Sequence, residues 1–310
     1  MDNSLPKFTL ACLCYNQAQF VIEALESVFN QTYPNLEIII VDDKSPDSSA
    51  QVIKDYLKQN EVEHEVQFIE NDVNLGNCKS FNKALSMATG KYIMDMAADD
   101  ILQPNHVQLH VDFFNNQEDN VGLIYSNAEY FYSNNNNANH LHFGPASKLR
   151  IHEGWVFKQV VQEYFIPTSS TIFRTSALKE LNGYDEELSF EDFDIWVRLS
   201  RNHQFKYLDV NTVQIRKHSN SMSTKWHTPN DPQTYDVYKI CLKIEQMIQN
   251  KGEKQALKTR IEYEIRMCFL HGLKKELNLF YELLQKINEV SLPYFVYYTI
   301  GQLGIRFIRK

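Results

Sequence analysis

The sequence has few cysteines, no excess of positive charge and none of the common glycine-rich nucleotide motifs. Its 310 residues include five cysteines, an odd number without metal-ligand spacing, so neither a disulfide framework nor a zinc site is expected. A net charge of −8 argues against nucleic-acid binding as the main function. A Walker loop, a dinucleotide glycine fingerprint and internal repeats are also absent from the sequence. These absences predict a reduced cytoplasmic protein that does not bind nucleic acid.

The sequence also offers little that would direct it into a membrane. Residues 1–10 lack a basic start and a long apolar run, so no signal peptide is expected. Residues 292–310 are apolar and aromatic, and they carry the basic residues Arg306, Arg309 and Lys310. Their uncharged part, about a dozen residues, is shorter than the ~20 residues that span a bilayer. Two interpretations stay open: an interfacial segment at a membrane surface, or a last helix packed on the protein.

What the sequence does contain is an alternation of apolar strands and amphipathic helices. Hydrophobic residues make up 43% of the chain, which is enough for a sizeable core. Strand-length apolar runs alternate with segments whose apolar residues recur at i, i+3, i+4 and i+7, such as Val21, Ala24, Leu25 and Val28. The expected strands are residues 8–14, 36–41, 65–69, 91–96 and 121–125, with a helix at 105–116 before the last. This alternation predicts an α/β fold whose mostly parallel sheet is covered by helices on both faces.

The pattern changes in the second half of the chain. An asparagine run at 134–137 lies in a stretch, residues 133–142, that is expected to be a loop. Residues 165–174 and 210–215 are expected to form strands, and residues 193–200 a helix. After residue 228, apolar residues at helical spacing predict three consecutive helices. We therefore expect a domain at 1–228 followed by a helical region at 229–310.

Polar residues gather where four of the predicted strands end. These are Tyr15 with Asn16, Asp42 with Asp43, Asn71 with Asp72, and Asp99 with Asp100. The carboxyl ends of parallel strands meet at one edge of a sheet, which is where ligands bind. Adjacent carboxylates repel each other unless a cation or several donors lie between them. Asp99 and Asp100 are therefore expected either to hold Mg²⁺ or Mn²⁺ or to cap the following turn and helix.

A second pair of acids, Glu191 and Asp192, lies at the amino end of the predicted helix at 193–200. Helix capping is one interpretation, because the helix dipole stabilises a carboxylate at that end. The same position also keeps a carboxylate ionised, as a general base requires. His218 follows the last predicted strand, in a polar loop where a single histidine is more often structural than a ligand.

Together these segments resemble family 2 glycosyltransferases, the inverting enzymes of the GT-A fold. The resemblance covers residues 8 to about 223. Its first motif is the opening strand and helix with YNQAQF and VDDKSPDSS, its second is NLGNCKSFNKAL with GKYIMDMAADDIL, and its third is GYDEELSFEDFDIWVRLSR. The order and spacing of the three motifs are those of the family. The resemblance implies a Rossmann-like GT-A sheet flanked by helices, with a nucleotide-binding half at about 1–126 and an acceptor-binding half at about 127–228.

The resemblance also implies roles for individual residues. Tyr15 would stack on or flank the nucleotide base, Asp43 would hydrogen-bond the base or ribose, and Asp42 would support Asp43. Lys79 would contact a phosphate. The implied nucleotide-binding residues are Tyr15, Asn16, Asp42, Asp43, Lys79 and Asp99.

For the reaction itself, the resemblance implies a divalent cation, Mn²⁺ or Mg²⁺, held by Asp99, Asp100 and His218. Asp192 would deprotonate the acceptor hydroxyl, and Glu191 would orient the acceptor. One position departs from the family pattern Asp-x-Asp-Asp, because Ala97 stands where the first acid is common. The cation would then depend more on the diphosphate, on water and on His218.

The implied activity is a hexosyl transfer with inversion. The donor would be a nucleotide-sugar, a UDP-sugar by preference, and the acceptor a hydroxyl of a glycan or lipid-linked molecule in bacterial cell-envelope polysaccharide synthesis. The basic, aromatic tail at 292–310 would suit peripheral contact with the inner face of the membrane. Two alternatives remain, a catalytically silent glycosyltransferase-like binding module and a sugar nucleotidyltransferase. A nucleotidyltransferase is expected to have a glycine- and arginine-rich first loop, whereas this chain has CYNQAQF.

Overall fold

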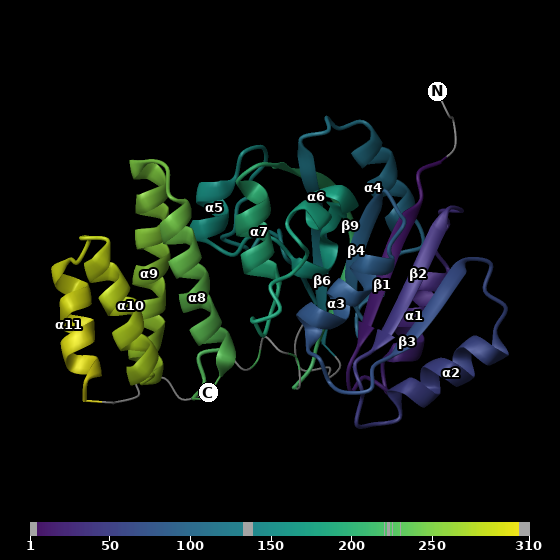
Figure 1. The fold of residues 1–310 in the computed structure, drawn as a ribbon, viewed down its shortest axis with the longest axis horizontal. Helices are drawn as coiled ribbons and strands as arrows, with labels where there is room; N and C mark the ends of the chain where they lie inside the picture. Colours follow the sequence, from purple (N-terminus) through teal and green to yellow (C-terminus); the bar gives the residue numbers. More distant parts are fainter. Residues whose placement is uncertain are drawn as a thin grey trace. The chain divides into compact units, whose positions relative to one another are not determined.

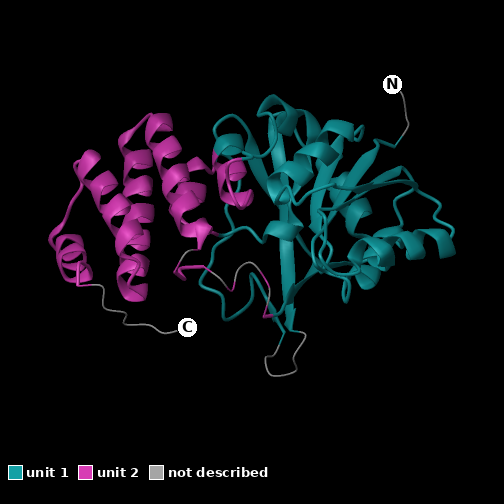
Figure 2. Ribbon diagram, turned by 60° about the horizontal axis from the view of Figure 1, so that its bottom comes forward, with its two compact units in different colours: residues 1–155, 165–186, 198–218 teal, residues 156–164, 187–197, 219–310 magenta. Residues whose placement is uncertain are grey.

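The computed structural model describes residues 5–132, 139–219, 221, 224, 226–229 and 231–303. The chain forms two compact units, which Figure 2 shows in different colours. The sheet unit comprises Met1–Trp155, Phe165–Glu186 and Arg198–His218. The helical unit comprises Val156–Tyr164, Glu187–Val197 and Ser219–Lys310. The predicted boundary near residue 228, and the predicted halves before it, stay predictions.

The first part of the sheet unit follows the predicted alternation closely (Figure 1). Its elements are β1 (Phe8–Cys14), α1 (Val21–Phe29), β2 (Leu36–Asp42), α2 (Ser49–Gln59), β3 (Glu65–Glu70), α3 (Asn77–Met87) and β4 (Tyr92–Ala97). The four strands are parallel and lie in the order β3-β2-β1-β4. All residues of β1 and β2 are buried, as expected for central strands covered on both faces.

The second part of the sheet is mixed in direction, which the sequence pattern did not indicate. Its elements are β5 (Ile101–Leu102), α4 (His106–Asn115), β6 (Val121–Tyr132), β7 (His140–Leu141), the 3₁₀ turn Thr168–Ser170, β8 (Ile172–Arg174), α6 (Thr175–Glu180) and β9 (Gln204–Lys217). The described strands follow the path β3-β2-β1-β4-β8-β6-β9-β5, and β7 pairs with β6. Strand β8 runs antiparallel to both β4 and β6, whereas β6 and β9 are parallel.

The strand predicted at 121–125 is confirmed as the first part of β6, which β8 separates from β4 in the sheet. Two other predictions need correction. Only the last three residues of the predicted strand at 165–174 form β8, since Pro167 and the turn after it interrupt the segment. Residues 140–141 form the short strand β7 within the stretch that was expected to be a loop. The asparagine run at 134–137 lies outside the described residues.

The core of the sheet unit lies between the strands and the helices on one face. Phe8, Leu10, Cys12 and Cys14 alternate along β1 and all belong to this core, together with residues of β2, β4, α1 and α4. Cys12 and Cys14, two positions apart on β1, share one face of the strand and are core thiols. All five cysteines of the chain are buried, and none of them forms a disulfide in the described structure.

The helical unit contains α5 (Phe157–Gln162), most of α7 (Asp192–Ser200), α8 (Pro232–Met247), α9 (Lys251–His271), α10 (Lys274–Lys286) and α11 (Leu292–Gly301). The three helices predicted after residue 228 are confirmed as α8, α9 and α10. Asn250 caps α9 by accepting a hydrogen bond from the N–H of Glu253, and Gly272, with φ of 68°, ends it. In the described part of the chain, none of the helices has the length and apolar character needed to cross a membrane.

Candidate active site

The loops after β1 and β2 meet at the carboxyl edge of the sheet. Tyr15 is 47% exposed, so one face of its ring is available to a ligand. Asn16 has φ of 58°, a left-handed conformation that asparagine tolerates, and its N–H donates to Ser45 Oγ at 3.0 Å. Asp42 is buried and accepts hydrogen bonds from the N–H and hydroxyl of Ser45. The structure therefore brings Tyr15, Asn16 and Asp42 together through Ser45.

Asp43, which also follows β2, organises the loop between β3 and α3. Its carboxylate accepts hydrogen bonds from the N–H groups of Leu75 and Gly76, each at 2.8 Å, and from Asn71 Nδ2 at 2.9 Å. Gly76 has φ of 85°, which favours glycine. Asp43 is thus placed beside the other strand-end residues, but a base or ribose would have to share a carboxylate that already has three donors.

One further residue of this edge, Lys83, escaped the sequence interpretation. Lys83 Nζ donates to Asn71 Oδ1 at 2.9 Å and so adds a cation behind the Asp43 loop. Lys79, the predicted phosphate contact, lies one helical turn earlier on α3 and is exposed. A spacing of four residues places Lys79 and Lys83 on the same side of the helix, and this spacing is a signal that the sequence already contained.

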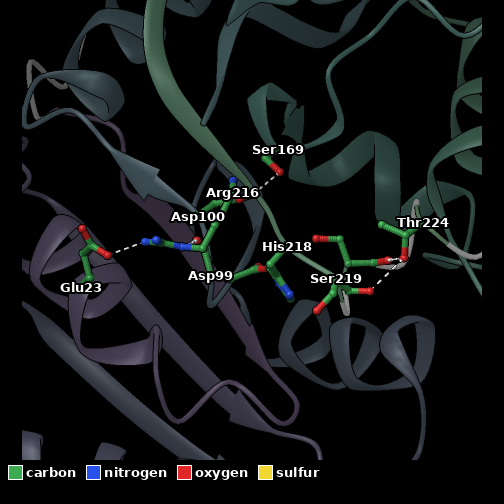
Figure 3. A network of polar contacts seen from close by, with 9 residues as sticks. Glu23, Asp99, Asp100, Ser169, Arg216, His218, Ser219 and Thr224 are labelled. Carbon is green, nitrogen blue, oxygen red and sulfur yellow. Dashed lines mark hydrogen bonds and ion pairs between the residues drawn. The ribbon is translucent and has the colours of Figure 1, made fainter. Parts of the chain in front are cut away.

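Asp99 contacts His218, although 119 positions separate them in the sequence (Figure 3). Asp99 Oδ2 lies 3.0 Å from His218 Nε2. Asp99 belongs to the turn between β4 and β5, and His218 follows β9. The ring of Phe20 lies 5.0 Å from the His218 ring, measured between centroids. The structure thus brings together two of the three residues predicted to bind a metal.

Asp100, the third predicted metal ligand, is buried with both carboxylate oxygens engaged. Ser169 donates its hydroxyl to Oδ2, and the backbone N–H of Arg216 donates to Oδ1 at 2.9 Å (Figure 3). Burial raises the pKa of Asp100 to about 7, and the adjacent Asp99 contributes to the shift. Asp100 therefore joins the acidic turn to β9 and to the segment before β8.

Arg216, on β9, fixes the same turn from the other side. Its Nε donates to the carbonyl oxygen of Asp99 at 2.9 Å, and its guanidinium forms an ion pair with Glu23 of α1 (Figure 3). The guanidinium also contacts the rings of Phe20 and Phe131, at 4.6 and 4.4 Å from their centroids. Sequence reasoning missed Arg216, although it lies only two positions before His218.

The residues of this turn fit a divalent cation only in part. Across the described ranges, no group of three or more His, Cys, Asp or Glu side chains has an arrangement that would hold a metal ion. Mg²⁺, however, is commonly bound through one or two carboxylates, with water and substrate phosphates as the other ligands. Asp99 and His218 fit such a site, whereas Asp100 would have to give up a hydrogen bond to join it. Ala97 offers no side-chain oxygen.

The helical unit holds the second acidic pair. Asp192 is the first residue of α7, and its Oδ1 accepts hydrogen bonds from the N–H of Phe193 at 2.6 Å and from the hydroxyl of Tyr164 at 2.7 Å. Glu191 precedes it and is half-buried like Asp192. The helix start and the tyrosine hydroxyl both favour an ionised Asp192. Tyr164 was not singled out from the sequence, where nothing local links it to Asp192.

The comparisons with known proteins agree with this architecture. The family model described as "Glycosyl transferase family 2" matches residues 10–181. The chain is 30% identical over 220 residues to an uncharacterised glycosyltransferase of Methanocaldococcus jannaschii, covering 70% of this chain and 72% of the relative.

Two solved structures are similar in fold. TarS residues 1–349 from S. aureus, in complex with UDP, gives a TM-score of 0.64 at 17% identity and covers 96% of this chain and 92% of that one. The mannosyltransferase PcManGT from Pyrobaculum calidifontis, in complex with GDP-Man and Mn²⁺, gives a TM-score of 0.60 at 16% identity. The match covers 97% of this chain and 81% of that one. These likenesses confirm the predicted fold class, a GT-A type, mostly parallel sheet with flanking and C-terminal helices. Because the family model spans more than half of the chain, the protein belongs to glycosyltransferase family 2 and is a glycosyltransferase.

Proposed function

We propose that the protein transfers a sugar, with inversion, from a UDP-sugar to a hydroxyl of a glycan or lipid-linked acceptor. The observation that carries this proposal is the Asp99–His218 contact at the carboxyl edge of a family 2 sheet. A divalent cation assists the reaction, and Asp192 acts as the general base. Inversion requires a single displacement, in which the acceptor oxygen attacks the anomeric carbon from the side opposite the leaving diphosphate.

The nucleotide binds at the loops after β1 and β2. The exposed ring of Tyr15 stacks on the base, because aromatic faces bind planar rings without requiring a particular hydrogen-bond pattern. Asn16, Asp42 and Asp43 shape the loops beneath it, and Lys79 reaches a phosphate. The UDP complex of TarS, a protein of similar fold, supports UDP as the nucleotide.

Asp99 and His218 would hold the cation, and Asp100, Ser169 and Arg216 keep their turn in place. When bound, the cation would supply Lewis-acid chemistry that neutralises charge on a departing diphosphate. Asp99 would contribute a carboxylate oxygen and His218 a ring nitrogen. The Mn²⁺ in the PcManGT complex supports a cation of this kind.

Asp192 removes the proton from the attacking acceptor hydroxyl, and Glu191 orients the acceptor beside it. Both acids lie at the start of α7, where the helix dipole favours a carboxylate. A carboxylate that remains ionised at neutral pH is ready to accept a proton without a preceding ionisation step.

A lipid-linked acceptor would agree with the surface of α11. Leu292 is 75% exposed and Phe295 51%, and helical spacing places both on one side of the helix. Leu303, two residues beyond the end of the helix, is 70% exposed. The tail beyond α11 adds Arg306, Arg309 and Lys310. We include peripheral contact with an anionic membrane surface in the proposal for this reason. The predicted location at the inner face of the membrane stays a prediction.

Calorimetric titration tests the donor and the cation together. Wild type, Asp99→Ala and Asp100→Ala are titrated with UDP, GDP and dTDP, with and without Mn²⁺. We expect wild type to bind UDP, and Mn²⁺ to raise the affinity for UDP by about tenfold or more. Asp99→Ala should lose this gain in affinity completely. The matched control is Asp55→Ala, which removes an exposed carboxylate on α2.

The titration also separates the rival interpretations. Binding of GDP or dTDP in place of UDP would correct the donor class while keeping the site. If none of the three nucleotides bound under any condition, the donor site would be wrong, and Ala97 would then be the residue to examine first. An Asp99→Ala protein that kept the full Mn²⁺ increment would contradict the cation site.

A further inference from the structure

Tyr164 lies between the acid at the start of α7 and a buried arginine of α9. Its hydroxyl donates to Asp192 Oδ1 at 2.7 Å, and its ring contacts Phe193 at 5.4 Å and Trp226 at 5.6 Å between centroids. Burial, and the charge of Asp192, hold the pKa of Tyr164 well above its usual range. The phenol is therefore protonated at every pH at which an enzyme works, and it acts as a permanent donor to Asp192.

Arg260 supports Tyr164 from behind. This arginine is 3% exposed, and its guanidinium lies 5.5 Å from the Tyr164 ring and 5.0 Å from the Phe193 ring, measured to the centroids. Its Nε donates to the carbonyl of Val161 at 3.2 Å, three residues before Tyr164. Arg260 therefore holds both the backbone that carries Tyr164 and the ring itself.

The charge of Arg260 is balanced within the same unit. Glu264 is fully buried and accepts from Arg260 Nη1 at 3.3 Å, and His227 Nε2 lies 3.1 Å from its other oxygen. A buried arginine paired in this way is costly to replace, because removing one partner leaves an unpaired buried charge. The arrangement places a buried, paired cation behind Tyr164.

We propose that Tyr164, held by Arg260, is a positioning residue that keeps the Asp192 carboxylate ionised and pointed toward the acceptor. This inference rests on the proposed role of Asp192 as general base. It also gives α9, which lies beyond the residues matched by the family model, a part in the reaction. A hydrogen bond donated to a carboxylate stabilises its charged form, and sharing Oδ1 between Tyr164 and the Phe193 N–H fixes the orientation of the side chain.

Tyr164→Phe removes the hydroxyl and leaves the packed ring. The charged or titratable groups around this point of the helical unit are Glu191 beside Asp192, and Arg260, Glu264 and His227 behind Tyr164. The substitution changes none of them. Full-length protein labelled with ¹³C at the aspartate carboxyl carbons is titrated by NMR, and the Asp192 signal is identified by its loss in Asp192→Asn.

We expect the midpoint of the Asp192 signal to rise by about one pH unit in Tyr164→Phe. The matched control is Tyr263→Phe, since Tyr263 borders the other side of Arg260, at 5.6 Å from its ring centroid. That control should leave the midpoint unchanged. An unchanged midpoint in Tyr164→Phe, or an equal shift in both variants, would overturn the proposal.

Turnover of UDP-GlcNAc with Mn²⁺ supplies a second measurement. Tyr164→Phe should lower kcat about tenfold and move the acid limb of the pH profile to higher pH, with KM for the donor unchanged. Full turnover in Asp192→Asn would contradict the role of Asp192 as general base, even if the midpoint of its NMR signal shifted as expected. If Tyr164→Phe had the pH profile of wild type while Asp192→Asn was inactive, the role of Tyr164 would be rejected and that of Asp192 would stand.

Discussion

At the scale of single residues, the turn after β4 depends on Arg216. The side chain does not reach a substrate in our proposal, yet it holds the Asp99 carbonyl, while its backbone N–H holds the Asp100 carboxylate. Its planar guanidinium fits between two aromatic rings and forms an ion pair with Glu23. An arginine in such a position is not interchangeable with a lysine, which lacks both the planar group and the fork of donors.

Arg216→Lys should therefore weaken the affinity of the UDP complex for Mn²⁺ about tenfold, the usual scale for residues that orient metal ligands. Binding of UDP without metal should stay the same, because the loops after β1 and β2 are unchanged. Calorimetry on the variant measures both quantities. Arg150→Lys, at an exposed position of the same unit, is the control, and equal Mn²⁺ affinities in the two variants would contradict the role of Arg216.

Asp192→Asn keeps the size of the side chain and removes its basicity. Since general-base help contributes roughly 10²–10⁴-fold, we expect turnover of UDP-GlcNAc to fall by about that factor. Calorimetric binding of UDP with Mn²⁺ should not change, because the substitution lies in the other unit from the nucleotide loops. A loss of less than about tenfold would show that another group accepts the proton.

At the scale of elements, α4 contains two buried histidines that the proposed reaction does not use. His106 Nδ1 pairs with Thr212 Oγ1 and His110 Nδ1 with the carbonyl of His106, each at 2.8 Å. The Nε2 atoms of both rings are buried without a hydrogen-bond partner among the described residues. Burial lowers the pKa of His110 from its usual 6.5 to about 4. Burial together with His110 holds the pKa of His106 well below its usual range.

These histidines should make the protein sensitive to acid. A depressed pKa in the folded state means that the unfolded chain binds protons more strongly. The free energy of unfolding therefore has its full value above about pH 6.5 and declines as the pH falls toward about 4. For His110, the free energy of unfolding lost over this pH window is about 3 kcal/mol. Urea unfolding of wild type and His110→Gln across this range should show a shallower decline in the variant. Parallel curves for the two proteins would rule out this contribution.

The last helix, α11, has two different faces. On one face Tyr297 stacks on Phe269, Tyr298 stacks on Tyr281, and Gly301 is buried where a Cβ atom would meet Leu277. For residues 292–301, this packing agrees with the alternative in which the segment forms a last helix packed on the protein. The other face carries the exposed Leu292 and Phe295, and Leu303 just beyond the helix is exposed as well. The packed helix is therefore still compatible with membrane contact.

Replacing Leu292, Phe295 and Leu303 together with serine tests that contact without disturbing the packed face. If the proposal is right, co-sedimentation with vesicles of phosphatidylcholine and phosphatidylglycerol should fall several-fold, because each lost apolar side chain removes buried area at the interface. Ile22→Ser, at an exposed apolar residue of α1, is the control. Equal sedimentation of the triple variant and wild type would end the membrane proposal.

At the scale of the whole molecule, two midchain segments, residues 156–164 and 187–197, belong to the helical unit rather than to the sheet unit. Residues 156–164 and 187–197 cluster with α8 to α11, so that the acids expected to act as base and orienting group are supported by the C-terminal helices. Arg260 is the clearest example, since it holds Tyr164 from α9. Sequence periodicity alone gives no indication of such an arrangement.

The sequence by itself determined the elements from β1 to β4, the helices α8 to α10 and the membership of the family, because apolar periodicity and motif spacing are local properties of the chain. It also indicated which acids would stand at strand and helix ends. Only the tertiary structure decided which partners those acids have. The contacts of Asp99 with His218, of Asp100 with Ser169 and Arg216, and of Tyr164 with Asp192 join positions 28 to 119 residues apart. The short strand β8 likewise lies between β4 and β6 through backbone pairing. A strand of three residues is too short to show a periodic pattern in the sequence.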